Sequence, residues 1–146
     1  LVASAKRNDM RLISVVMGTK SANARANENQ TLLNYGFRFF ETHKLYNSHE
    51  SLTKNRIWKG DKNNLELGLA DDLYVTIPRR HYNDLKAEIS VDKKISAPVS
   101  EGQPVGKVNV SLAGETVSEQ PLIALSTVGK GNFFQRIYDE ALLLLQ

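Results

Sequence analysis

Residues 32–42, with the sequence LLNYGFRFFET, decide how the first part of this chain folds. The apolar positions recur at helical spacing, so they share one face of a predicted helix: Leu32, Leu33, Gly36, Phe37 and Phe40. Ser21 carries the hydroxyl that suits a helix N-cap, so the helix is expected to begin beside it. The sequence therefore predicts an amphipathic helix whose apolar face needs a surface to pack on.

Little apolar sequence precedes this helix. Two short apolar runs, residues 1–5 and 11–17, are joined across Lys6-Arg7-Asn8-Asp9, which predicts a hairpin. An isolated hairpin is marginally stable in water, and one helix covers only one of its faces. Residues 1–41 are therefore expected to be a β-β-α piece of a larger sheet, and the chain the later part of a longer protein. The uncovered apolar side chains are expected to drive self-association or to leave this segment without order.

The character of the sequence changes after the helix. Residues 42–54 are polar and unpatterned, and they are expected to be a linker. From 55 to 128, short apolar alternations are broken by turn residues, which predicts a mainly antiparallel β-sandwich domain. The expected strands cover residues 56–59, 65–67, 73–77, 85–91, 95–97, 105–112 and 116–125. Pro121 interrupts the last of these strands, which should therefore run along an edge or break there.

Residues 129–146 predict a C-terminal amphipathic helix. Gly129-Lys130-Gly131 ends the β pattern, and Asn132 can cap a helix that continues to Leu145. At about 14 residues, this helix is too short to span a bilayer, which needs roughly 20. The residues alone leave two placements open: the helix lies in a membrane interface, or it packs on the sandwich.

Composition and charge argue against several classes of function. The net charge is +3, and the basic residues are interleaved with acidic ones along the chain. No aromatic residues are spaced along a basic stripe, so no nucleic-acid-binding groove is predicted. The chain has no Cys, and His43, His49 and His81 lack partners at metal-ligand spacing, so no metal or other cofactor is predicted. Asp71-Asp72 is expected to flank a turn, and Trp58 to anchor the core.

Motifs along the whole chain resemble one protein family. They are Met10-Arg11-Leu12-Ile13-Ser14-Val15-Val16-Met17-Gly18, Tyr35-Gly36-Phe37-Arg38-Phe39-Phe40-Glu41-Thr42, Ile57-Trp58-Lys59-Gly60-Asp61, Thr76-Ile77-Pro78-Arg79, Asp84-Leu85-Lys86-Ala87 and Gly131-Asn132-Phe133-Phe134. In order and spacing they are similar to the low-molecular-mass penicillin-binding proteins, which are serine-type D-alanyl-D-alanine carboxypeptidases of the bacterial periplasm. The resemblance implies an α+β fragment, with residues 1–41 as the terminal hairpin and helix of a penicillin-binding, β-lactamase-like domain.

The resemblance also implies an activity for the parent protein. Such a hydrolase removes the terminal D-alanine from peptidoglycan pentapeptides through an acyl-serine intermediate, needs no cofactor, binds β-lactams, and acts in cell-wall synthesis and cell shape. Its Ser-x-x-Lys, Ser-x-Asn and Lys-Thr-Gly motifs are expected upstream of Leu1, so this chain alone is expected to be inactive.

Short matches to those motifs do occur in the chain. Ser51-Leu52-Thr53-Lys54 and Ser90-Val91-Asp92-Lys93 satisfy Ser-x-x-Lys, and Ser21-Ala22-Asn23 satisfies Ser-x-Asn. Ser51 and Ser90 lie in polar or β-alternating sequence rather than at the start of an apolar helix. With 19 Lys and Arg residues in the chain, these matches are interpreted as chance.

Arg25 is the one residue here that the resemblance places at the active site. In the family, an arginine at this point is associated with the terminal carboxylate of the substrate, and a guanidinium can bind a carboxylate in bidentate fashion. From the residues alone, a solvated Arg25 side chain paired with Glu28 at i+3 is the favoured interpretation. The family register favours substrate binding.

The resemblance also implies an anchor. Members of the family dock to the inner membrane through a C-terminal helix, so the protein is expected to be periplasmic and peripheral on that membrane. The predicted membrane-contacting residues are Phe133, Phe134, Ile137, Tyr138, Leu142 and Leu145. The alternative function is a non-catalytic β-sandwich module that binds a partner protein or a cell-wall glycan near the membrane.

Overall fold

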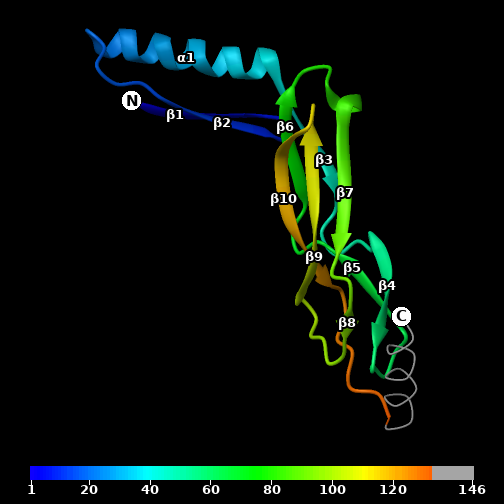
Figure 1. The fold of residues 1–146 in the computed structure, drawn as a ribbon. Helices are drawn as coiled ribbons and strands as arrows, with labels where there is room; N and C mark the ends of the chain where they lie inside the picture. Colours follow the sequence, from blue (N-terminus) through cyan, green and yellow to red (C-terminus); the bar gives the residue numbers. More distant parts are fainter. Residues whose placement is uncertain (133–146) are drawn as a thin grey trace. The chain divides into compact units, whose positions relative to one another are not determined.

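A computed structural model describes residues 1–132 of the protein (Figure 1). Within this range the protein is mainly β, with a single α-helix and a short 3-10 helix, η1. In chain order the elements are β1 (Val2–Arg7), β2 (Met10–Val15), α1 (Ala22–Phe39), β3 (Phe40–Tyr46), β4 (Thr53–Trp58), β5 (Asn64–Gly68), β6 (Leu73–Pro78), η1 (Tyr82–Asp84), β7 (Leu85–Val91), β8 (Ile95–Ser96), β9 (Pro104–Leu112) and β10 (Glu115–Ala124). Contacts divide the chain into two units, each described by itself: the first is Leu1–His43 with Tyr74–Leu85, and the second is Lys44–Leu73 with the described residues from Lys86 onward.

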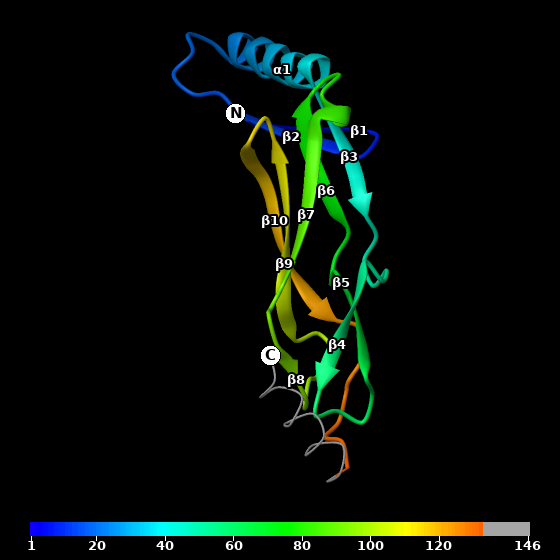
Figure 2. The same ribbon diagram turned by 45° about the vertical axis from the view of Figure 1, so that its right-hand side comes forward.

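The first unit is built on the hairpin of β1 and β2. The strands pair antiparallel from Val2 opposite Val15 to Arg7 opposite Met10. α1 lies along this hairpin (Figure 2), and it approaches closely at Gly36, where a Cβ atom would collide with the Leu12 side chain. The β-β-α order expected from the sequence is confirmed.

A buried polar pair ties α1 to β2. The Ser14 hydroxyl donates to Oδ1 of Asn29 at 2.6 Å, and both side chains are buried. Nδ2 of Asn29 in turn donates to the carbonyl of Arg25 at 2.9 Å and lies 3.5 Å from the carbonyl of Leu1. Because a buried amide without partners is costly, this arrangement fixes the helix in one register on the hairpin.

The helix presents a narrower apolar face than the sequence predicts. Phe37 is buried and Leu33 half-buried, but Leu32 remains 48% exposed. Phe40 is not in the helix and instead begins β3. The predicted single face through Leu32 and Phe40 is therefore wrong, because the two-stranded hairpin is wide enough to cover only one stripe of α1.

The outer face of the hairpin is uncovered in the described structure. Its large apolar side chains, Val2, Ile13 and Val15, are more than half exposed, and so are Leu1 and Met17 just beyond the ends of the two strands. This agrees with the expectation that the hairpin is short of packing partners.

The segment expected as a linker, residues 42–54, contains regular structure. β3 extends through it to Tyr46 and pairs with β6, and β4 begins at Thr53. The hydroxyls of Thr42 and Thr76 lie 2.8 Å apart across the β3–β6 pair. The boundaries of the two units therefore differ from the expected 1–41 and 55–128, because residues 74–85 return to the first unit.

The second unit contains a six-stranded sheet in the order β7-β9-β10-β5-β4-β8. Most pairs are antiparallel, whereas the short β8 pairs parallel with β4. The long strand β10 pairs with β9 over most of its length and then with β5 at Ile123 and Ala124. Its register shifts at two points, between Thr116 and Ser118 and between Leu122 and Ile123, and such shifts bend a strand, so the sheet curls.

Pro121 lies just before the second of these shifts. It faces Lys107 of β9, whereas the pairing of β10 with β5 begins two residues later. The strand therefore has one partner at the proline and changes register beside it, as expected for a residue without an amide hydrogen.

The core of the second unit comes from buried side chains of this sheet and of the segments beside it. In the sheet they include Ile57, Leu65, Leu67, Val108, Val110 and Leu122, and beside it Leu69, Leu73 and Val128. Trp58 is also buried, with the Arg56 guanidinium carbon 3.9 Å from the centre of its ring, so the expected core role of Trp58 is confirmed.

The described chain ends against the sheet. Val128 pairs with Val99 and Lys130 with Gly60 through isolated bridges, and the Gly129 amide donates to Asp61. The helix predicted from Asn132 to Leu145 lies outside the described residues. Among residues 1–132, no helix is both long enough and apolar enough to cross a membrane.

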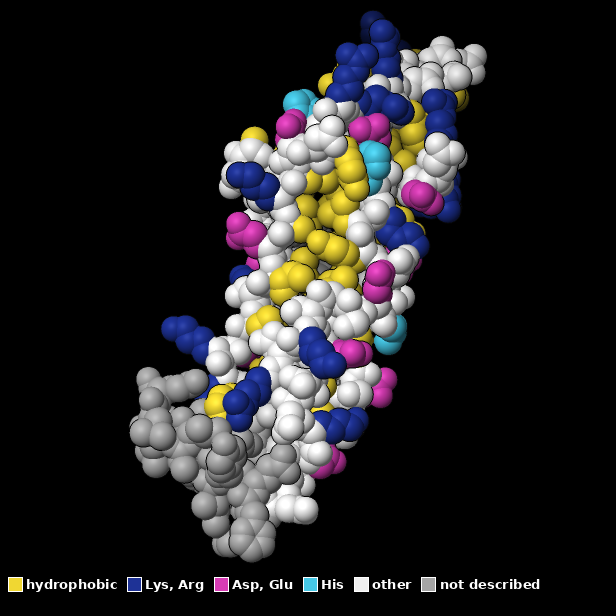
Figure 3. Space-filling view, turned by 90° about the vertical axis from the view of Figure 1, so that its right-hand side faces the viewer, with side chains coloured by type: hydrophobic (Ala, Val, Ile, Leu, Met, Phe, Trp, Pro, Cys, Tyr) yellow, Lys and Arg dark blue, Asp and Glu magenta, His cyan; other side chains and the backbone are white. Residues whose placement is uncertain are grey.

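Charges of both signs are distributed over the surface. Figure 3 shows one face, on which Lys and Arg side chains are interspersed with Asp and Glu over most of its extent. This distribution agrees with the interleaved charges of the sequence.

Replacing Asn29 with Ala should destabilise the helix–hairpin contact by about 1–3 kcal/mol, because the buried Ser14 hydroxyl would lose its partner. Asn27→Ala is the matched control, since Asn27 is exposed on the same helix and its loss should change stability by less than about 0.5 kcal/mol. Urea unfolding followed by helical circular dichroism measures both variants. Equal effects would show that the buried pair contributes nothing specific.

Candidate functional site

Arg25 lies in the first turn of α1. Ser21 caps this helix as predicted, because its side-chain oxygen accepts the Ala24 amide at 3.1 Å. The Arg25 amide donates to the Ser21 carbonyl, and the Arg25 carbonyl accepts from buried Asn29. The backbone of Arg25 is therefore held on both sides, and its side chain is half-buried.

The guanidinium of Arg25 forms no hydrogen bond or ion pair within residues 1–132. The alternative expected from the sequence, an i+3 pair with Glu28, is not formed there. The first turn of α1 also contains no acidic residue. A cation in this position opposes the helix dipole, so an anion bound beside it would be stabilised both by the charge and by the dipole.

The two Ser-x-x-Lys matches do not lie in the surroundings that a catalytic serine needs. Ser51 is exposed ahead of β4, and the Lys54 ammonium lies 4.0 Å from a Glu66 carboxylate oxygen. Ser90 lies within β7, and Lys93 follows the end of that strand. Neither serine opens a helix, so neither has the geometry in which a lysine lowers the cost of deprotonating a serine.

The Ser-x-Asn match, Ser21-Ala22-Asn23, is part of the N-cap of α1. The Ser21 side chain is engaged by the Ala24 amide, and the Thr19 hydroxyl donates to the Ser21 carbonyl at 3.0 Å. These hydroxyls stabilise the start of α1.

The three histidines do not form a metal site in the described structure, because each has separate surroundings. His81 lies 2.8 Å from Asp84, and His49 occupies a left-handed turn position with φ of 58°. His43 packs its ring against Tyr82 with centroids 4.5 Å apart. Residues 1–132 contain no group of three or more ligand-type side chains that could hold a metal.

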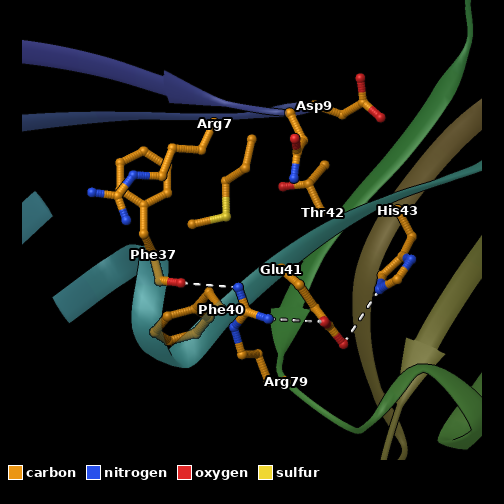
Figure 4. A pocket seen from close by; sticks show the side chains of 10 residues that line it. Arg7, Asp9, Phe37, Phe40, Glu41, Thr42, His43 and Arg79 are labelled. Carbon is orange, nitrogen blue, oxygen red and sulfur yellow. Dashed lines mark hydrogen bonds and ion pairs between the residues drawn. The ribbon is translucent and has the colours of Figure 1, made fainter. Parts of the chain in front are cut away.

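Sequence reasoning missed a polar cluster around Glu41 (Figure 4). One carboxylate oxygen of Glu41 lies 3.3 Å from Nε2 of His43 and accepts the Arg80 amide at 3.2 Å. The other oxygen lies 3.7 Å from the Arg79 guanidinium, which also donates to the Phe37 carbonyl at 3.0 Å. The cluster borders a cavity of about 280 Å³, which Arg7, Asn8, Asp9 and Met10 of the hairpin also line.

These contacts set the ionisation of Glu41. The His43 side chain, the Arg80 amide and the Arg79 charge hold the pKa of Glu41 below its ordinary value. A carboxylate that stays ionised and already has partners is a poor general base near neutral pH. The cluster therefore joins the start of β3 to the turn after β6 and does not resemble a catalytic centre.

Asp71 and Asp72 have separate surroundings. Asp72 accepts the Ser48 amide at 2.8 Å and lies 3.0 Å from the Lys44 ammonium, and these contacts lower its pKa. Asp71 is exposed in the turn before β6. The pair flanks a turn, as the sequence predicts.

The predicted membrane-contacting residues, from Phe133 to Leu145, lie outside the described residues. Of the predicted site residues, the structure therefore describes Arg25 alone.

Comparison with known proteins identifies relatives over most of the chain. Residues 40–130 match the family model described as "Penicillin-binding protein 5, C-terminal domain". D-alanyl-D-alanine carboxypeptidase DacC of Escherichia coli (strain K12) is 42% identical over 140 residues, which cover 95% of this chain and 35% of that protein. DacA of the same strain is 41% identical with the same coverage.

Solved structures give the same result. Penicillin-binding protein 5 from Haemophilus influenzae superposes with a TM-score of 0.83 at 39% identity, over 89% of this chain and 38% of that one. The D-alanyl-D-alanine carboxypeptidase DacD from Francisella tularensis gives a TM-score of 0.61 at 29% identity, over 89% of this chain and 33% of that one. The chain thus spans little more than a third of the length of the relatives it matches. On the match to residues 40–130, the chain belongs to the penicillin-binding protein 5 C-terminal domain family.

Proposed function

We propose that this chain is the C-terminal part of a D-alanyl-D-alanine carboxypeptidase that removes the terminal D-alanine from peptidoglycan pentapeptides. The observation that carries the proposal is that similarity to such enzymes covers 95% of the chain, including the hairpin and α1 as well as the curled sheet. The acyl-serine chemistry and the β-lactam binding belong to the longer protein.

The first unit contributes scaffold and one substrate contact. β1, β2 and α1 form the end of the penicillin-binding domain, and Arg25 binds the terminal carboxylate of the pentapeptide. The held backbone of Arg25 and its unpaired guanidinium within residues 1–132 support this role.

The second unit is a stalk between the catalytic domain and the membrane. The bends of β10 support its description as a β-sandwich, with β7 and β9 on one side of the bend and β5, β4 and β8 on the other. Residues 129–146 provide a peripheral anchor on the inner membrane, with the protein in the periplasm. The alternative is a non-catalytic module that binds a partner protein or a glycan, and it is favoured if the longer protein lacks a Lys-Thr-Gly motif before Leu1.

The isolated 146-residue chain should not be labelled by a fluorescent penicillin and should not release D-alanine from a pentapeptide, because the nucleophile lies elsewhere. The longer protein is the positive control in the same gel-based assay. Stoichiometric labelling of the short chain at Ser51, Ser90 or any other serine would contradict this assignment.

In the longer protein, Arg25→Ala should raise KM for substrates with a free terminal carboxylate by a factor equivalent to roughly 1.5–3 kcal/mol, the value of a charged hydrogen bond. Amides or esters of the same peptide should be affected much less. Lys20→Ala removes a nearby exposed cation and serves as the control. An equal loss on charged and neutral substrates would exclude a carboxylate contact.

The 146-residue chain should self-associate through the uncovered face of its hairpin. Ile13 and Val15 are 68% and 57% exposed on β2, and Ile13→Lys with Val15→Lys should return the chain to a monomer in sedimentation velocity. Val117→Lys, at a 41% exposed position on β10, is the control that should leave association unchanged. A wild-type chain that sediments as a well-folded monomer would rule out this surface.

A further inference from the structure

A second exposed surface of the first unit combines aromatic and cationic side chains. We call it the aromatic–arginine patch, and its residues are Tyr35, Arg38, Phe39, Pro78, Arg79 and Arg80. The patch lines an open hollow of about 510 Å³ between the last turns of α1 and the turn after β6. All six residues belong to the first unit.

The two aromatic side chains of the patch are exposed and lie against each other. Tyr35 is 58% exposed and Phe39 46%, and their ring centroids lie 4.7 Å apart at a tilt of 46°. These rings do not contribute to the packing of α1 on the hairpin, where Gly36 and Phe37 are used. Two adjacent exposed rings form an apolar platform that a partner side chain can cover.

The cationic half of the patch has little internal compensation. Glu41, the acidic residue that contacts Arg79, is also engaged by His43 and the Arg80 amide. The Arg38 guanidinium carbon lies 5.5 Å from the centre of the Phe39 ring. Within residues 1–132, the guanidinium groups of Arg38 and Arg80 have no ion pair. The patch is therefore complementary to a negatively charged partner.

The patch is also preformed. The Arg79 amide donates to the Phe39 carbonyl at 2.9 Å, and the Arg79 guanidinium donates to the Phe37 carbonyl at 3.0 Å. These bonds fix the turn after β6 against the end of α1. A partner therefore does not need to order the surface on binding, which lowers the entropic cost of association.

We propose that the aromatic–arginine patch docks an acidic peptide segment of a partner protein that carries an aromatic side chain. Carboxylates suit the planar forks of Arg38 and Arg80, and an aromatic side chain suits the platform of Tyr35 and Phe39. A hollow of about 510 Å³ beside two adjacent rings matches a short peptide segment better than a broad lipid surface. This inference is independent of the carboxypeptidase assignment, because it uses neither Arg25 nor the C-terminal residues.

The test uses a rhodamine-labelled peptide of sequence GEFEEWEG, with GEAEEAEG and GKFKKWKG as probes that remove its aromatic rings and reverse its charge. Fluorescence anisotropy is measured with the 146-residue chain and with the longer protein. The first peptide should bind both proteins at least about tenfold more tightly than either control peptide, and its affinity should fall as salt is raised. Equal binding of the first two peptides would reduce the patch to a nonspecific cationic surface and overturn the proposal.

Variants locate the contact. Arg38→Ala combined with Arg80→Asn should weaken binding at least about tenfold, and Asn suits the left-handed backbone of position 80, where φ is 71°. Tyr35→Ser should also weaken it, whereas Lys6→Ala combined with Lys20→Ala removes two exposed cations of the same unit and should not. The proposal fails if the control pair weakens binding equally, if the longer protein does not bind the peptide, or if anionic phosphatidylglycerol vesicles replace the peptide as the preferred ligand of the patch.

Discussion

The buried hydrogen bond between Ser14 and Asn29 determines how the first unit presents its surfaces. It fixes the register of α1 on the hairpin, and Asn29 also holds the carbonyl of Arg25. Because an α-helix rises about 1.5 Å per residue, Arg25 and Phe39 lie roughly 20 Å apart at opposite ends of this fixed rod. One internal constraint therefore positions both the predicted substrate contact and the aromatic–arginine patch. A slip of α1 by one residue would rotate both surfaces by about 100° around the helix axis.

The six-stranded sheet of the second unit depends on one strand, β10, which pairs with both β9 and β5. β10 pairs with β9 for most of its length and reaches β5 only at Ile123 and Ala124, after a register shift. The same shift follows Pro121, which has no amide hydrogen to donate to a second neighbour. A residue that would weaken an ordinary central strand is thus placed where the strand changes partner. The buried residues beside it, Leu122 to Ala124, then join the core that β4 and β5 share.

The sequence predicts elements that local contacts determine. The hairpin, the Ser21 cap, the buried Trp58 and most strands of the second unit agree with the structure. The sequence does not predict β3, because its partner β6 lies about thirty residues away and its own side chains show no clean alternation of burial. The Glu41 cluster depends on the same distant pairing, because Arg79 and Arg80 contact Glu41 only when β6 pairs with β3. Family resemblance alone points to Arg25, because no local pattern distinguishes it from a surface arginine.

The two exposed apolar surfaces of the first unit differ in physical character. The outer face of the hairpin is aliphatic, with Ile13 and Val15 offering no group that water can bind, so it favours continuous cover by more protein. The aromatic–arginine patch mixes two rings with three guanidinium groups, which remain well solvated when no partner is present. The first surface therefore suits permanent burial within a larger fold, whereas the second suits a partner that binds and leaves. This difference follows from the chemistry of the side chains on the two surfaces.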